Sequence, residues 1–149
     1  MPCSLLAKTI VPTVRPEHVD VGKTPSTEWR RIYEREQGAG RIAEYPKILE
    51  LMPEPHVFLL ATVGGGAAGV AVAIKVGDDV AVEGVRTLSE FRRYGVARAV
   101  MQAAEAWAAE EGATRMLLSV VDDNVPAVGL YSGLGYARIT GYRYRVKKA

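Results

Sequence analysis

Residues 80–112 read VAVEGVRTLSEFRRYGVARAVMQAAEAWAAEEG, and a change of periodicity within this stretch decides the fold. Its first part is rich in β-branched residues, which predicts a strand over Val80–Leu88. From Val96 onward apolar residues recur at the spacing of one helix face, which predicts a helix from Gly95 to Glu111. A strand, a loop and an amphipathic helix in this order indicate an α+β or α/β fold with helices packed on a sheet.

The loop between this strand and this helix reads RRYGVAR over residues 92–98 and has the features of an anion site. The first N–H groups of a helix have no intrahelical partner, and the helix dipole adds partial positive charge there. Gly95 and Ala97 leave room for a phosphate, while Arg92 and Arg93 supply charged donors. We therefore expect a phosphate ester such as a pyrophosphate here. An ordinary surface loop with solvated arginines is the alternative.

Composition limits where such a ligand can bind. The 149 residues carry a formal net charge of +2, whereas residues 86–98 hold four arginines against one acid, Glu90, a local excess of +3. This balance argues against a protein that coats nucleic acid and against a polybasic membrane anchor. A bound anion would therefore have to contact a local cluster of positive charge. The single cysteine excludes an internal disulfide, and with only two histidines we expect no metal. No apolar run could span a membrane, and we expect one cytoplasmic domain.

Further elements are expected on either side of this stretch. Glycines 64, 66 and 69 match a dinucleotide-binding fingerprint, but a strand follows them instead of a helix, so they indicate a hairpin turn. The other predicted elements are strands over Val57–Val63, Val70–Val76, Met116–Val121 and Tyr142–Val146, and a helix over Val125–Leu134.

The first third of the chain gives weaker signals. Ile10–Val14 could form a strand, at a sheet edge because Pro12 cannot donate to a ladder. Thr24 and Pro25 suggest the start of a helix that groups Trp29 and Tyr33 on one face, and Pro46–Met52 suggests a second helix.

A second motif follows the strand Met116–Val121. It runs from Asn124 through Ala127 and Leu130-Tyr131 to Leu134-Gly135-Tyr136, and it resembles the N..A..LY..LGF segment of the GCN5-related N-acetyltransferase (GNAT) family. Arg-x-x-Gly-x-Ala at residues 92–97 resembles the acyl-CoA signature of the same family. The resemblance covers about Val57 to Lys147.

The resemblance implies a single domain over residues 1–149, with 1–55 on the substrate side and 56–149 as the acyl-CoA-binding core. The implied fold is a mixed, twisted sheet of six to seven strands with about four helices. It is splayed between the fourth and fifth strands, here Val80–Leu88 and Met116–Val121. The implied cosubstrate is acetyl-CoA, with no metal. Its implied binding residues are Val85, Arg86, Thr87, Leu88, Arg92, Arg93, Tyr94, Gly95, Val96, Ala97, Arg98, Asn124 and Tyr131.

The implied activity is direct attack of a primary amine on the thioester in a ternary complex. Tyr131 matches the family tyrosine near the sulfur, so it is the candidate general acid; a packed core tyrosine is the alternative. Glu83 is the only carboxylate within its strand, and strand alternation predicts that it shares a face with Val85 and Thr87. Partial burial there would raise its pKa, and a water relay is the alternative base. Trp29 and Tyr33 are tentative substrate contacts.

Some residues depart from the family pattern. Ser89 stands where proline is usual, Tyr94 where a small or basic residue is common, and Gly129 and Gly133 loosen the second motif. Because of these departures, the family pattern does not identify the acceptor. The acceptor could be a small-molecule or peptide amine, and the protein a monomer or homodimer, without nucleic-acid or membrane partners.

Two other functions are weighed. An acyl-CoA-binding regulatory domain would keep the fold without catalysis. A single-stranded RNA-binding module would use Tyr142 and Tyr144 with the basic residues around them. Strand alternation, however, separates these tyrosines from the cations, as on a strand with one buried and one solvated face.

Overall fold

The computed structural model describes residues 2–37 and 52–143. In chain order the elements are β1 (Pro2–Thr9), β2 (Val19–Gly22), α1 (Thr27–Gln37), β3 (His56–Val63), β4 (Gly66–Val76), β5 (Asp79–Thr87), the 3₁₀ turn η2 (Ser89–Phe91), α3 (Val96–Glu110), β6 (Arg115–Val121), α4 (Val125–Gly133) and β7 (Ala137–Arg143). The strands form one sheet of seven in the order β2-β3-β4-β5-β6-β1-β7, and β5–β6 is its parallel pair. The predicted mixed sheet is confirmed.

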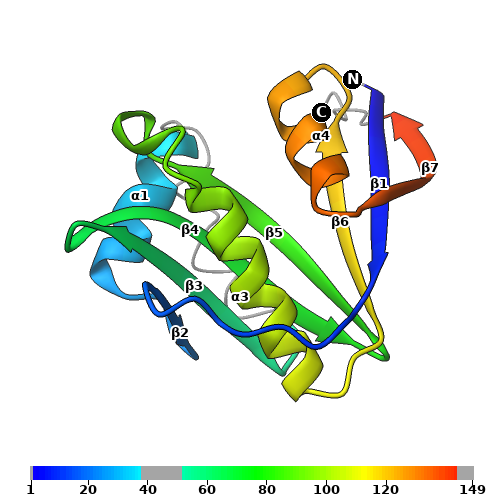
Figure 1. Cartoon of the computed structure of the whole chain (residues 1–149), viewed down its shortest axis with the longest axis horizontal. Helices are drawn as coiled ribbons and strands as arrows, with labels where there is room; N and C mark the ends of the chain where they lie inside the picture. The colour runs from blue at the N-terminus through cyan, green and yellow to red at the C-terminus, as the bar shows by residue number, and fades with distance from the viewer. Residues whose placement is uncertain (1, 38–51, 144–149) are drawn as a thin grey trace, which may run out of the picture.

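Helices α1 and α3 cover opposite faces of the β2–β5 part of the sheet (Figure 1). Along β3 the side chains alternate between them: Leu59 packs in the core under α3, and Phe58 packs with Trp29 of α1. Helix α3 lies close to the sheet because its buried face is built largely from alanines. The helix predicted at Gly95–Glu111 is confirmed, with Gly95 as its N-cap residue.

Gly69 in β4 allows α3 to approach the sheet. A Cβ at this position would clash with Cγ1 of Val96 and would lie 3.1 Å from the carbonyl oxygen of Arg86. The glycines before it form the predicted hairpin turn, since Gly64 and Gly65 have positive φ and Val63 pairs with Gly66. Gly69 therefore allows α3 to pack closely on β4, and the match to a dinucleotide-binding fingerprint is coincidental.

We expect Gly69→Ala to lower the free energy of unfolding by about 1–3 kcal/mol, because the added methyl group overpacks the junction between α3 and β4. Chemical denaturation would measure the loss. The matched control is Gly129→Ala in α4, where a Cβ would meet no atom within 4 Å. Alanine is the better helix former, so the control should be neutral or stabilising by about 0.5–1 kcal/mol. Equal effects of the two substitutions would contradict the packing argument.

Strands β5 and β6 pair at one end and separate at the other. Their parallel pairing covers Asp79–Val82 and Arg115–Leu118, after which the strands diverge toward α4 (Figure 1). Beyond this point β5 still pairs with β4, and β6 still pairs with β1 up to Val121. The predicted splay between these two strands is confirmed.

A partly buried ion pair connects the two sides of this split. Lys8 lies on β1, beside β6, and its ammonium group contacts the carboxylate of Glu105 on α3. Glu105 is almost fully buried, with only 5% of its side chain exposed. The Lys8 ammonium also lies 5.7 Å from the centre of the Tyr136 ring.

Two predictions for the N-terminal third are wrong. The first strand is β1 at Pro2–Thr9, not Ile10–Val14. It lies between β6 and β7, where Pro12 could not donate to a ladder, so the strand ends before the proline. Helix α1 does not start at Thr24-Pro25: the Ser26 hydroxyl accepts from the N–H of Trp29 at 3.1 Å and caps the helix.

Some predicted elements extend beyond the described residues. All of the second predicted helix except Met52 lies outside them, as do Tyr144–Val146 of the last predicted strand. That strand, β7, starts earlier than predicted, at Ala137. Among the helices that the structure describes, none is long and apolar enough to cross a bilayer.

Candidate active site

The separation of β5 from β6 opens a cavity of about 700 Å³. Its walls come from both strands, from β1 and from α4, and its lining residues are Leu5, Ala81, Val82, Glu83, Gly84, Val85, Arg86, Leu117, Leu118, Ser119, Val120, Val121, Asn124, Ala127 and Tyr131. Where β5 leaves β6, its backbone groups on that side lose their strand partner. An extended ligand with amide groups could pair with them as an added strand.

A second cavity of about 260 Å³ lies at the N-terminus of α3. It is lined by Thr87, Phe91, Arg92, Arg93, Gly95, Val96, Ala97, Arg98 and Leu130. The first helical bond runs from the N–H of Ala99 to the carbonyl of Gly95, so the N–H groups before Ala99 have no intrahelical acceptor. Gly95 provides no side-chain cap. This end of the helix therefore has the donors that an anion needs.

Backbone conformation strengthens this anion site in a way that the sequence did not reveal. Arg93 and Gly95 both have φ of 71°, in the left-handed region. Alternation of left-handed and extended or helical residues turns successive N–H groups toward one concave surface, which is a known form of anion site. Glycine adopts this conformation freely, whereas at Arg93 it is unusual, and no feature of the local sequence predicts it.

Helix α4 brings Asn124 and Tyr131 to the larger cavity. The Asn124 side-chain oxygen accepts from the N–H of Ala127 at 3.3 Å and caps the helix, leaving its NH₂ group to donate elsewhere. Tyr131 is buried, and burial raises the pKa of its phenol, partly opposed by the positive charge of Arg86. The phenol therefore stays protonated at neutral pH and is able to donate a hydrogen bond or a proton.

Glu83 lines the same cavity but is exposed, and it lies on a different face of β5 from the one predicted. One extra residue at Gly84, where φ is 65°, forms a bulge, so Glu83 pairs with Val72 and Arg86 pairs with Val70. Both valines pack on the α1 side of the sheet. Glu83 therefore shares its face with Arg86, and the expected alternation with Val85 and Thr87 is wrong.

The two candidate substrate contacts on α1 differ in position. Trp29 lies in the core, where its indole N–H donates to the carbonyl of Ala71 at 3.0 Å. Tyr33 stacks on Trp29 and is only partly buried. A Cβ at Gly84 would lie 3.0 Å from the Tyr33 ring, and the Arg86 guanidinium lies 5.9 Å from its centre. Of the two residues, Tyr33 is the one next to the cavity wall.

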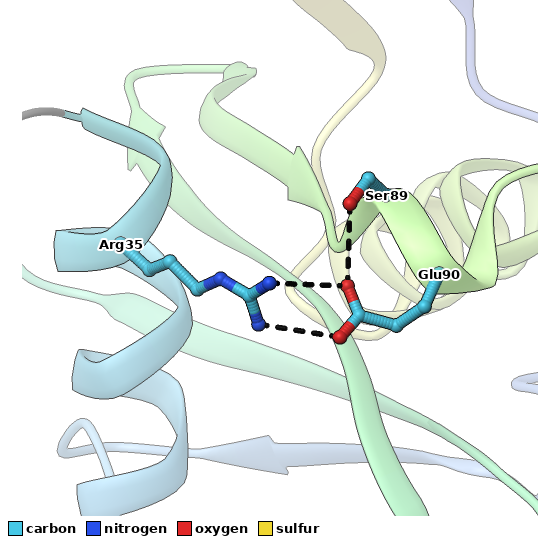
Figure 2. A network of polar contacts seen from close by, with 3 residues as sticks. All are labelled: Arg35, Ser89 and Glu90. Carbon is cyan, nitrogen blue, oxygen red and sulfur yellow. Dashed lines mark hydrogen bonds and ion pairs between the residues drawn. The ribbon is translucent and has the colours of Figure 1, made fainter.

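An ion pair links α1 to the turn that leads into the anion site (Figure 2). The Arg35 guanidinium donates to both carboxylate oxygens of Glu90, at 3.3 and 3.4 Å, and the Ser89 hydroxyl donates to the same carboxylate at 3.3 Å. The backbone N–H of Glu90 and the Arg35 guanidinium both lower the pKa of this carboxyl. Ser89 thus helps to orient Glu90.

Comparisons with known proteins agree with this geometry. A model of the acetyltransferase (GNAT) family matches residues 26–136. The chain is 26% identical over 126 residues to the uncharacterized N-acetyltransferase YobR of Bacillus subtilis (strain 168), a match that covers 83% of this chain and 51% of YobR. The chain thus spans about half the length of this relative.

Two solved structures illustrate the likeness in fold. AAC(6')-Iy in complex with the bisubstrate analog CoA-S-monomethyl-acetylneamine superposes with a TM-score of 0.65 at 23% identity, over 87% of this chain and all of that one. The ribosomal-protein-S18-alanine N-acetyltransferase from Escherichia coli gives a TM-score of 0.66 at 18% identity, over 82% of this chain and 79% of that one. Because the family model spans most of the sequence, including the arginine-rich loop and the α4 motif, this chain belongs to the GNAT acetyltransferase family.

Proposed function

We propose that the protein transfers an acetyl group from acetyl-CoA to a primary amine, by direct attack of the amine in a ternary complex. The observation that carries this proposal is the separation of β5 from β6 beside an anion site at the N-terminus of α3. An extended arm that ends in a pyrophosphate matches this pair of cavities. The complex of AAC(6')-Iy with a CoA-containing bisubstrate analog supports the same cosubstrate.

The residues present suit such a cosubstrate. The N–H groups of residues 93–98, with Arg92 and Arg93 beside them, would hold the pyrophosphate. The backbone of Val85–Leu88 would pair with the pantetheine amides, and the Asn124 NH₂ group would donate to the same arm. When bound, acetyl-CoA supplies an activated acyl group as a thioester.

Two side chains of this chain would move protons. Glu83, at the open side of the cavity, would accept a proton from the ammonium group of the acceptor, directly or through a water molecule. Tyr131 would donate a proton or a hydrogen bond to the departing thiolate, for which its protonated, buried phenol is suited. Because both side chains line one cavity, an amine and a thioester bound there would be held close together, with a proton acceptor and a proton donor beside them.

We expect acetyl-CoA to stabilise the protein in a thermal-shift experiment. At 100 times the dissociation constant the ligand should add about 2.7 kcal/mol to the free energy of unfolding. Acetyl-pantetheine, which lacks the pyrophosphate, should give a much smaller shift at equal concentration, and so should acetyl-CoA added to an Arg92→Ala/Arg93→Ala variant. Absence of any shift at millimolar acetyl-CoA would overturn the proposal.

Measuring the release of CoA thiol with a panel of amines would distinguish an acetyltransferase from a regulatory domain that only binds acyl-CoA. Transfer to at least one amine, with intersecting initial-velocity lines, is the expected result for a ternary complex. Tight binding of acetyl-CoA with no transfer to any amine would instead favour the regulatory domain.

A further inference from the structure

We propose that the acceptor is a small primary amine that also carries an anionic group, and that Arg86 binds this group. This inference rests on the proposed acetyl transfer and concerns the acceptor side of the same cavity. It starts from the bulge at Gly84, which places the side chain of Arg86 on the face that looks toward α1.

Arg86 is held in a defined position. Its Nη1 donates to the carbonyl oxygen of Val85 at 3.0 Å, and its guanidinium lies over the ring of Tyr33, 5.9 Å from the centre. Contact with an aromatic face and one backbone bond restrict the side chain, so less entropy is lost when a ligand binds to it. The residue is half-buried and lines the cavity beside Glu83.

The charge of Arg86 has no acidic partner among the residues that the structure describes. The ion pairs found there join Lys8 to Glu105, Arg35 to Glu90 and Arg115 to Asp79. A guanidinium has five N–H donors, and partial burial without a counter-ion is unfavourable. A carboxylate or phosphate oxygen from a ligand would compensate this charge with two parallel hydrogen bonds.

The cosubstrate does not explain this cation. Its pyrophosphate would bind at the N-terminus of α3, which packs on the opposite face of β5 together with Thr87. Arg86 instead faces α1, on the same side as Glu83. Arg86 also lines the same cavity as Glu83 and Tyr131, the two residues proposed to move protons. A bound group that it neutralises would therefore belong to the acceptor.

Glu83 and Arg86 together indicate the charge pattern of that acceptor. They occupy successive positions on one face of β5, which lie roughly 7 Å apart along a strand. An amine near Glu83 and an anion on Arg86 describe a compact zwitterion, such as an amino acid or an aminosugar phosphate. Polyamines and aminoglycosides would bring further positive charge toward Arg86, which is unfavourable.

The test compares matched acceptors that differ in one charge. Acetyl transfer would be measured for L-methionine against L-methioninamide, for glucosamine 6-phosphate against glucosamine, and for spermidine. We expect at least one anionic member to exceed its neutral partner in kcat/KM by about 10- to 100-fold, the contribution of a charge-assisted hydrogen bond. The two pairs also distinguish a carboxylate from a phosphate as the recognised group.

Variants connect this preference to Arg86. Arg86→Met should abolish the preference, mainly through KM, and Arg86→Glu should shift it toward cationic amines. The dissociation constant of acetyl-CoA should change little, because only the backbone of residue 86 would contact the cosubstrate. Arg15→Met, which removes an exposed positive charge outside the cavity lining, is the control and should keep the preference.

A binding measurement keeps the proposal falsifiable without turnover. In the presence of CoA, calorimetry would compare N-acetylmethionine with its amide, and N-acetylglucosamine 6-phosphate with N-acetylglucosamine. Tighter binding of an anionic member that is lost in Arg86→Met supports the proposal even if no acceptor turns over. Equal binding within both pairs, or a preference that survives Arg86→Met, overturns it while leaving acetyl transfer itself intact.

Discussion

Replacing Tyr131 with phenylalanine should lower kcat by roughly 100-fold or more, since general acid catalysis by a positioned side chain contributes about 10²- to 10⁴-fold. The ring would still fill its buried position against Tyr136, whose ring centre lies 6.1 Å away, so packing should be kept. In the proposed mechanism the phenol would contribute its proton only in the transition state, and therefore the dissociation constant of acetyl-CoA should change by less than about twofold. Steady-state kinetics with thiol detection, together with calorimetric titration of acetyl-CoA, would measure both quantities.

Tyr136→Phe is the matched control for this substitution. The Tyr136 hydroxyl is buried and has no hydrogen-bond partner among the described residues, and burial with the nearby Glu105 carboxylate raises the pKa of this phenol. Removing an unpartnered buried hydroxyl should leave kcat unchanged and keep or increase stability. If both variants lost activity equally, the effect at Tyr131 would come from packing rather than from proton donation.

Replacing Lys8 with methionine should lower the free energy of unfolding by about 3 kcal/mol, the lower end of the usual cost of leaving one member of a buried ion pair alone, because Lys8 is itself 22% exposed. Glu105 has only 5% of its side chain exposed, so water can replace the lost ammonium only in part. Methionine preserves most of the apolar stem, which restricts the change to the charge. Urea denaturation of the wild type and the variant would measure the difference.

The double variant Lys8→Met/Glu105→Met distinguishes the contribution of the ion pair to stability from that of side-chain packing. Because it removes both charges, it should recover most of the stability that the single variant loses. A double variant no more stable than Lys8→Met would show that the charge of Lys8 is not what stabilises this contact between β1 and α3.

The C-terminal part of the fold could be predicted because its signals are local. The strand Val80–Leu88, the loop and the helix that follows each have a periodicity or capping pattern within a few residues, and all appear at nearly the predicted positions. The anion site follows from the same segment, since a helix N-terminus and its flanking arginines are contiguous in sequence.

Features that depend on contacts between distant segments could not be predicted in this way. The bulge at Gly84 adds one residue to β5 and reverses the face of every later side chain, so strand alternation placed Glu83 with the wrong neighbours. Trp29 had the spacing of an amphipathic helix, but only the pairing of its indole N–H with Ala71 identifies it as core. The position of the Arg86 guanidinium depends on Tyr33, which lies far from it in sequence.

The place of β1 in the sheet has a consequence for the order in which the protein folds. Cys3 pairs with Val121 on one side and with Tyr142 on the other, so the first strand completes its ladders only with residues near the other end of the chain. Such distant pairings slow folding, because a long loop must close before they form. During synthesis β6 can meet β5 before β7 has been made, whereas β1 gains its second neighbour only when β7 emerges. The edge of the sheet beyond β6, which consists of β1 and β7, is therefore among the last parts of the molecule to be fixed.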